Sequence, residues 1–238
     1  MRYSGSEGPQ LRQVSLSVSP GEVLGVIGAS GSGKTTLARI LAGGMKPTGG
    51  VMRLDGAAYE ARPGDDLAQH IGYLPQTPSL FAGTIKDNIA RFVSTLEQDL
   101  GQVDRDAVAA AQAAGAHDMI LRLPQGYDTM LGPFGAGLSA GQAQRVALAR
   151  AMFRDPVLLI LDEPNSNLDQ DGETALLAAV RCAAARGAAV VVVAHRAGVL
   201  AQVDRLLMLA DGAVQIEGPR ESVLERLRHA GLKANSAA

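Results

Sequence analysis

The segment at residues 28–35 is the feature that most constrains how this chain folds. It reads Gly-Ala-Ser-Gly-Ser-Gly-Lys-Thr and fits the pattern G-x-x-x-x-G-K-[ST]. An apolar run at residues 23–27 precedes it, and good helix formers at residues 36–42 follow it. A glycine-rich loop between a buried strand and a helix lets several backbone N–H groups converge on phosphate oxygens. The candidate phosphate-binding residues are Gly28, Ser30, Gly31, Ser32, Gly33, Lys34, Thr35 and Thr36.

A second apolar run, residues 157–161, ends in the adjacent carboxylates Asp162 and Glu163. At the carboxyl end of a buried strand, Asp162 and the hydroxyl of Thr35 are suited to hold a Mg²⁺ ion that bridges phosphates. Lys34 adds a point charge for the β and γ phosphates, and Glu163 can polarise an attacking water. The carboxylate pair favours hydrolysis of a nucleoside triphosphate over its storage. These two motifs still leave kinases, GTPases, helicases and transporters open.

Length and composition restrict the number of domains, the class of partner and the cellular compartment of the chain. Its 238 residues suffice for one large domain or for one domain with an inserted subdomain. The formal net charge of −2 does not favour nucleic acid as a partner, and no apolar run approaches the roughly 18 residues of a membrane span. The single cysteine, Cys182, allows no internal disulfide, and the amino terminus lacks the apolar stretch of a signal peptide. A reducing compartment, most simply the cytoplasm, is expected.

The order of expected elements indicates an α/β chain interrupted by a helical block. Strands and helices alternate before residue 84 and after residue 156, whereas residues 84–153 read as helices, for which Thr84 and Ser139 are suitable caps. We therefore expect a P-loop NTPase core of the RecA-like type, with a mainly parallel sheet, an amino-terminal antiparallel β part and an inserted all-helical subdomain. The expected strands are 11–18, 23–27, 52–54, 71–75, 157–161 and 189–194; the expected helices are 36–42, 85–92, 104–114, 117–123, 140–153, 171–186 and 221–229.

A third motif separates transporters from the other nucleotide hydrolases. Residues 138–142 read Leu-Ser-Ala-Gly-Gln, and Gln-Arg follows at 144–145. This segment closely resembles the L-S-G-G-Q signature of the ATP-binding cassette (ABC) family, and the resemblance spans nearly the whole chain. Further positions match in the family's order: Gln76 as the loop glutamine, Asn167-Leu168-Asp169 as the D-loop, His195 as the switch histidine, and Tyr3 as the aromatic that stacks on adenine.

The resemblance implies an ATPase that binds ATP and Mg²⁺ in a head-to-tail dimer. Each ATP would lie between the glycine loop of one copy and residues 139–142 of the other, with Gln76 sensing the nucleotide state. The resemblance implies that the catalytic residues are Glu163, His195, Lys34 and Gln76, and that the metal is held by Thr35, Gln76 and Asp162. The other nucleotide contacts would come from Tyr3, Ser139, Gly141, Gln142 and Asp169.

Residues 76–89 resemble the stretch typical of exporter cassettes, in which a cytoplasmic helix of the transmembrane domain is received. Leu80 and Phe81 would anchor that helix. Residues 123–129, 162–169 and 194–196 resemble ATPases of type I protein secretion systems. That subgroup implies work at the cytoplasmic face of the bacterial inner membrane, with a periplasmic adaptor and an outer-membrane channel as partners.

Four alternatives remain open at this point. The chain could serve an exporter of lipid, peptide or drug, or it could be a stand-alone ATPase subunit that docks on a separate permease. It could also be a soluble ABC ATPase that acts on ribosomes or DNA without a membrane domain, or a catalytically silent module, which Glu163 and His195 argue against. Because an exporter of this group carries transmembrane helices ahead of its cassette, we expect residues 1–238 to be a motor domain excised from a longer chain.

Two residues depart from the family pattern. Ala140 replaces the usual signature glycine and adds a Cβ near the phosphate of the partner site, so weaker ATP affinity or closure is expected. Pro133 stands where exporters often have a glutamate that touches the membrane-domain helices, which puts that contact in question.

Overall fold

A six-stranded mixed sheet lies at the centre of the computed structural model, which describes residues 11–62, 64–93, 99–194 and 197–229. Its strands are β1 (Val23–Ile27), β4 (Ile71–Leu74), β7 (Leu158–Asp162), β8 (Ala189–Val193), β9 (Arg205–Ala210) and β10 (Ala213–Pro219). They follow the order β10-β9-β1-β8-β7-β4. The first five along the chain are parallel, and β10 runs antiparallel to β9. The expected P-loop α/β fold is confirmed.

The central strands are apolar on both faces because each face contributes to a separate core. In β7, Leu159 and Leu161 belong to one buried cluster, whereas Leu158 and Ile160 belong to the other. Strands β1 and β8 divide their side chains in the same way. A parallel strand covered on both faces reads as a continuous hydrophobic run, which is the pattern seen at residues 157–161.

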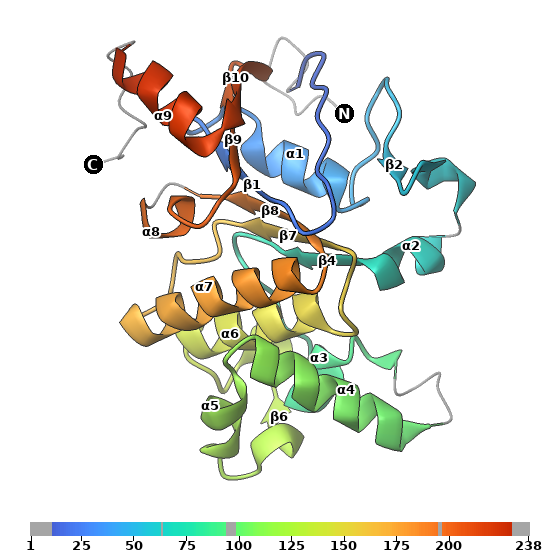
Figure 1. Ribbon diagram of the computed structural model, residues 1–238. Coiled ribbons are helices and arrows are strands. Elements are labelled where there is room, and N and C mark those ends of the chain that lie inside the picture. Colours follow the sequence, from blue (N-terminus) through green and yellow to red (C-terminus); the bar gives the residue numbers. More distant parts are fainter. Residues whose placement is uncertain (1–10, 63, 94–98, 195–196, 230–238) are drawn as a thin grey trace.

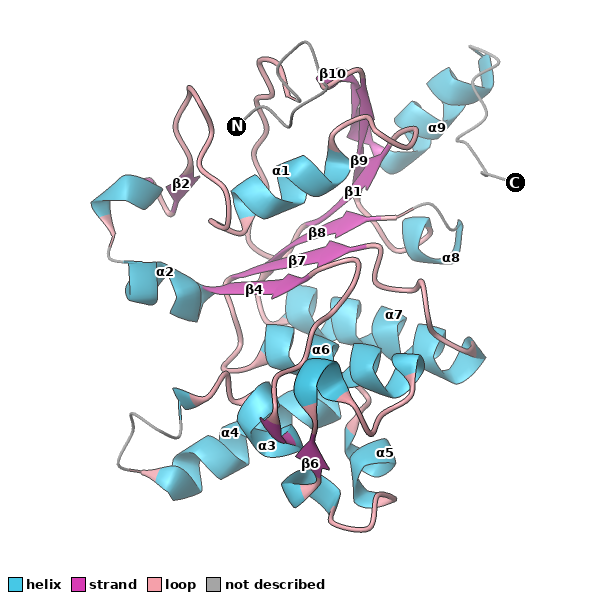
Figure 2. Cartoon of the chain, turned by 180° about the vertical axis from the view of Figure 1, so that it is seen from behind, coloured by secondary structure: helices cyan, strands magenta, loops and turns pink. Residues whose placement is uncertain are grey.

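Helices cover the two faces unequally, as Figures 1 and 2 show. Helix α1 (Lys34–Leu41) and the small hairpin of β2 (Arg53–Leu54) and β3 (Ala57–Ala58) lie on one side. Helices α6 (Ala140–Met152) and α7 (Gln170–Ala185) lie on the other. The remaining elements are η1 (Tyr59–Ala61), α2 (Gly64–His70), β5 (Gly83–Thr84), α3 (Ile85–Ile89), α4 (Leu100–Ala113), α5 (His117–Leu121), η3 (Gly126–Asp128), β6 (Met130–Leu131), η4 (Pro133–Gly135), α8 (Ala197–Leu200) and α9 (Arg220–His229).

The block expected at residues 84–153 contains α3, α4, α5 and α6 in succession and lies below the sheet in Figure 1. Thr84 and Ser139 each form a capping box, with Asp87 and Gln142 respectively, as helix-start chemistry predicts. The block is not purely helical, because β5 pairs with β6 in a short antiparallel ladder. No described helix is long and apolar enough to span a bilayer.

Residues 11–18 do not form the strand that their alternating pattern predicts. Side chains such as Leu16 pack half-buried against the core, so the alternation correctly reports which side is buried. Gln13, however, has φ +48°, which interrupts the extended backbone, and the Arg12 N–H donates to the Gly212 carbonyl at 2.7 Å. Antiparallel pairing in the amino-terminal part is therefore reduced, among the described residues, to the hairpin β2–β3.

Helix starts also differ from the expected ones. Helix α1 begins at Lys34 instead of Thr36, because Gly33 adopts φ +104° and starts the helix inside the glycine motif. Helix α4 begins four residues earlier than expected, because the Asp99 side chain accepts a hydrogen bond from the Gln102 N–H and caps it.

Candidate nucleotide-binding and hydrolysis site

The predicted site residues converge at the carboxyl edge of the sheet. The glycine loop follows β1, Gln76 follows β4, and Asp162 ends β7. Because these strands are parallel, their carboxyl ends meet at one edge, where open α/β sheets bind ligands. The Thr35 hydroxyl lies 3.4 Å from Oδ1 of Asp162, and Gln76 donates through Nε2 to Oε2 of Glu163 at 2.8 Å.

Glycine is required at the first position of the loop. Gly28 has φ +151°, and a Cβ there would lie 2.2 Å from the Leu209 carbonyl oxygen. Gly31 and Gly33 have φ +78° and +104°, a region that side chains disfavour. These conformations bring the loop back over the start of α1, where backbone N–H groups are free of helical partners.

Lys34 folds back over the loop. Its Nζ donates to the carbonyls of Gly28 and Ala29, at 2.8 Å each. Burial lowers the pKa of Lys34, and the nearby charges of Glu163 and Asp162 oppose that shift. The arrangement holds a cationic amine beside a loop built to receive phosphate.

Asp162 has the features expected of a Mg²⁺ ligand. It is fully buried, and its Oδ2 has no hydrogen-bond partner among the described residues. Burial raises the pKa of Asp162, whereas the hydrogen bond from Thr35 lowers it. A buried polar atom without a partner is uncommon, and Mg²⁺ is typically held by one or two carboxylates together with substrate phosphates. Among the described residues, no three His, Cys, Asp or Glu side chains lie together in a way that could hold a metal ion.

Because its ionised form is desolvated, Asp162 is expected to reduce the stability of the ligand-free chain at neutral pH. A folded-state pKa above the ordinary value of 3.8 stabilises the fold only at low pH, and that stabilisation disappears as pH rises through the folded pKa. Asp162→Asn should therefore raise the unfolding temperature by a few degrees at pH 8 and by less at pH 4. Calorimetry beside the exposed control Glu60→Gln measures the difference. A gain equal at both pH values would contradict this assignment.

Glu163 is held in an uncommon conformation. Its φ is +48°, which is strained for a residue with a side chain. The Glu163 N–H donates to the Val193 carbonyl at 2.9 Å, and its own carbonyl accepts from Ser166. The backbone therefore turns sharply where β7 ends. The amide of Gln76 on the Glu163 carboxylate was not predicted from the sequence, which placed Gln76 near the metal.

The signature segment forms an exposed helix start. Ser139 accepts a hydrogen bond from the Gln142 N–H at 3.3 Å, and the Ser139 N–H donates to the Gln142 side chain at 2.9 Å. The following helix is 13 residues long, so its amino end carries a positive dipole. Among the described residues, no hydrogen bond joins residues 139–142 to the glycine loop of the same chain.

Asp169 caps a helix in this structure. Its Oδ1 accepts from the Gly172 N–H at 2.8 Å and pairs with Arg145 at 2.6 Å. The hydrogen bond from Gly172, with that from Arg145, lowers the pKa of Asp169. Asp169 thus joins the start of α7 to α6. Tyr3 and His195 lie outside the described residues.

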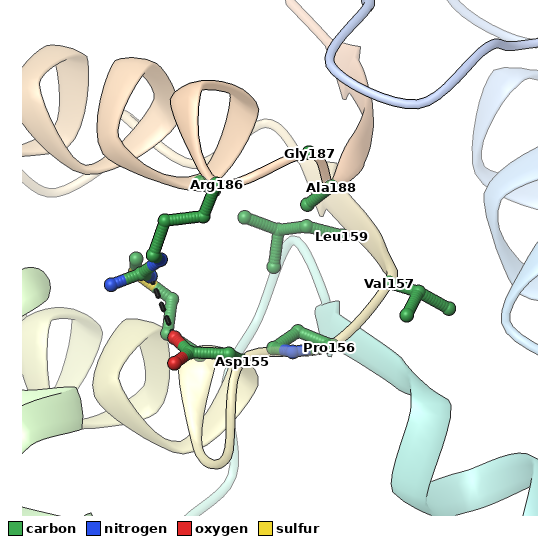
Figure 3. Close-up of a pocket in the computed structure, with 9 residues that line it drawn as sticks. Asp155, Pro156, Val157, Leu159, Arg186, Gly187 and Ala188 are labelled. Atoms are coloured by element: carbon green, nitrogen blue, oxygen red, sulfur yellow. Dashed lines mark ion pairs between the residues drawn. The ribbon is translucent and has the colours of Figure 1, made fainter.

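A small cavity of about 70 Å³ lies at the opposite edge of the sheet (Figure 3). Asp155 and Arg186 pair across it at 2.8 Å, beside Pro156 and Leu159. Pockets for small ligands typically enclose about 300–1,000 Å³. This cavity is therefore not the nucleotide site.

Comparison with known proteins decides the family. A model described as ABC transporter matches residues 11–166, a span that includes the glycine loop, the signature segment and Glu163. The chain belongs to the ABC transporter family. It is an ATP-binding domain of that family, whose members with this domain are ATPases.

Two curated relatives of this ABC domain are named for secretion. The type I secretion system ATP-binding protein PrsD of Rhizobium meliloti strain 1021 is 52% identical over 211 residues, covering 89% of this chain and 35% of the relative. The cyclolysin secretion/processing ATP-binding protein CyaB of Bordetella pertussis is 40% identical over 223 residues, and the match covers 94% of this chain and 30% of the relative. The ABC domain thus spans about a third of the length of these relatives.

A solved structure of a bacterial Atm1-family ABC exporter with ATP bound has the same fold as this ABC domain. The TM-score is 0.83 at 33% identity, and the match covers 99% of this chain and 41% of the exporter chain. The predicted resemblance to exporter cassettes and to type I secretion ATPases is confirmed.

Proposed function

We propose that this ABC domain is the ATP-hydrolysing motor of an exporter that secretes proteins by a type I secretion system. One observation carries the proposal: two side-chain hydrogen bonds, from Thr35 to Asp162 and from Gln76 to Glu163, lie at the same edge of the sheet. The 52% identity to PrsD supports the secretion class. An ATP-dependent lipid A-core flippase is also similar to this chain, at 35% identity. Lipid is therefore the alternative class of cargo.

Each site residue has a role that its surroundings support. The loop N–H groups and Lys34 bind the phosphates of ATP, and Glu163 accepts a proton from the attacking water. Gln76 holds the Glu163 carboxylate until substrate and water replace that contact. Thr35 and Asp162 would hold Mg²⁺, which neutralises charge that develops on the transferred phosphoryl group.

A second copy of the chain would complete each site. The amino end of α6 is exposed at Ser139 and Ala140, and no described hydrogen bond joins it to its own glycine loop. A helix start of this kind attracts anions, and its hydroxyl and backbone amides suit a γ-phosphate. In the proposed head-to-tail dimer, the amino end of α6 contacts the ATP that is bound to the partner copy, and Asp169 lies near the interface.

Membrane-domain docking is proposed on an apolar face beside the β5–β6 ladder. Phe81, Met130 and Phe134 are 61%, 63% and 87% exposed, respectively. Leu80, by contrast, is buried at 1% beneath Gly135 and cannot serve as the anchor expected from the sequence. Large apolar side chains gathered on a surface typically mark an interaction site.

The site of action follows from this docking. A cytoplasmic helix of a transmembrane domain, in the same or a partner chain, would cover the apolar face. The domain then works at the cytoplasmic face of the bacterial inner membrane, and a periplasmic adaptor and an outer-membrane channel continue the route.

The export function can be tested in cells that carry the gene with its natural neighbours. Lys34→Met should abolish both secretion into the medium and ATP hydrolysis by the purified protein, reducing kcat/KM at least about a hundredfold because the phosphates lose their cation. Lys46→Met, an exposed lysine, is the matched control and should change neither. Phe134→Asp should stop secretion yet leave hydrolysis by the isolated domain intact. Normal secretion by the Lys34→Met cells would refute the motor role.

A further inference from the structure

The side chain of Gln144 connects the signature helix to the catalytic edge of the same chain. It lies two residues beyond Gln142 on α6, so the two side chains point to opposite sides of the helix, about 200° apart. Gln144 is 1% exposed. Its Nε2 donates to the carbonyl of Pro164 at 2.9 Å, a buried hydrogen bond.

Pro164 immediately follows Glu163, whose backbone is strained. A left-handed conformation at a non-glycine residue persists only where neighbouring contacts determine it. Three contacts act here: the Val193 carbonyl holds the Glu163 N–H, the Glu163 carbonyl accepts from Ser166, and Gln144 fixes the next peptide. Because Pro164 has no N–H, its carbonyl is the one backbone group of that residue through which a hydrogen bond can act.

The neighbour of Gln144 on the helix fastens the far end of the same segment. Arg145 pairs with Asp169 at 2.6 Å, and the Gly141 backbone lies so close to the Asn167 carbonyl oxygen that a Cβ there would be 3.0 Å away. Residues 163–169 are therefore attached to α6 at both ends. Any shift of α6 acts on the backbone that carries Glu163.

Stability alone does not account for this buried amide. Oε1 of Gln144 is also buried and has no hydrogen-bond partner among the described residues. An amide that gains one hydrogen bond while leaving a buried oxygen unsatisfied contributes little net stability, because the two effects are of similar size. An apolar side chain of similar length would fill the same space.

We propose that Gln144 is a positioning residue for hydrolysis: it fixes the Pro164 carbonyl and thereby holds the carboxylate of Glu163 where it meets the attacking water. The inference rests on the proposed role of Glu163. Helix α6 would then have two roles. Its start at the signature segment would face the partner copy, and Gln144, on the opposite side of the helix, would act within the same chain.

Gln144→Met tests the inference, because methionine matches glutamine in length and lacks the donor. We expect kcat for ATP hydrolysis to fall about tenfold, since a small displacement of a catalytic group is enough for such a loss. The KM for ATP and the affinity for a fluorescent ATP analogue should stay within twofold. The unfolding temperature should stay close to wild type. Gln112→Met, the same change on an exposed site of α4, is the control.

Combination with Glu163→Gln separates this inference from the function on which it rests. The double variant should still form a Mg-ATP-dependent dimer, because Gln144 faces away from the surface that meets the partner. If Gln144→Met keeps the wild-type kcat while Glu163→Gln is inactive, the positioning role is wrong and the proposed function stands. If kcat, ATP affinity and unfolding temperature fall together, Gln144 is only structural. If the methionine variant does not fold, the same measurements are made on Gln144→Leu. Wild-type hydrolysis by Glu163→Gln would instead overturn the role of Glu163 itself.

Discussion

Glu163→Gln should lower kcat for ATP hydrolysis by about a thousandfold and leave ATP binding intact. General-base catalysis contributes typically 10²–10⁴-fold, and an amide does not accept the proton of the attacking water. Glutamine keeps the size of the side chain and an oxygen that can accept from Gln76, whose Nε2 lies 2.8 Å from the present carboxylate. The conformation of the site should therefore survive while its chemistry stops.

The same variant is expected to accumulate as a dimer when Mg-ATP is present, because in the proposed head-to-tail dimer the phosphate that joins the two copies is no longer removed. Light scattering with and without Mg-ATP measures this, and a phosphate-release assay measures the rate. Glu60→Gln makes the same chemical change on an exposed carboxylate and should match wild type in both assays. Hydrolysis by Glu163→Gln at the wild-type rate would show that another group is the base.

Gly72→Ala should destabilise the fold by about 3 kcal/mol, near the upper end for overpacking a core. A Cβ at Gly72 would lie 2.0 Å from the Ala151 carbonyl oxygen and 2.9 Å from Cγ of Pro156. That carbonyl cannot move away freely, since it accepts a hydrogen bond from Arg91, which also holds the Arg150 carbonyl at 3.0 Å. The end of α6 is thus fixed against β4.

For a chain of this size, such a loss corresponds to a fall of roughly 6–12 °C in the unfolding temperature. Gly49→Ala is the matched control, because a Cβ there meets nothing within 4 Å, and it should leave the unfolding temperature nearly unchanged. Calorimetry on both variants decides the matter. Equal unfolding temperatures for the two would mean that α6 can yield at Ala151, and that its end is not a fixed point.

The sequence alone was sufficient for several features that depend on neighbours along the chain, although it misplaced the starts of α1 and α4. The glycine loop, the run that ends in Asp162 and Glu163, and the cap at Ser139 are local patterns, because strand burial and helix capping act over a few residues. Those patterns predicted the α/β core and its chemistry, and the family comparison confirmed the class.

Only the tertiary structure decided which distant groups meet. The alternation at residues 11–18 indicates a buried side but not a pairing partner, so the expected strand was wrong. The contacts Gln76 to Glu163 and Gln144 to Pro164 join residues 87 and 20 positions apart, and nothing in local periodicity encodes them. The first arises because β4 pairs with β7 in the sheet, and the second because α6 packs beneath the sheet. Local sequence patterns thus identified the functional residues of this protein, and long-range packing determined which of those residues contact one another.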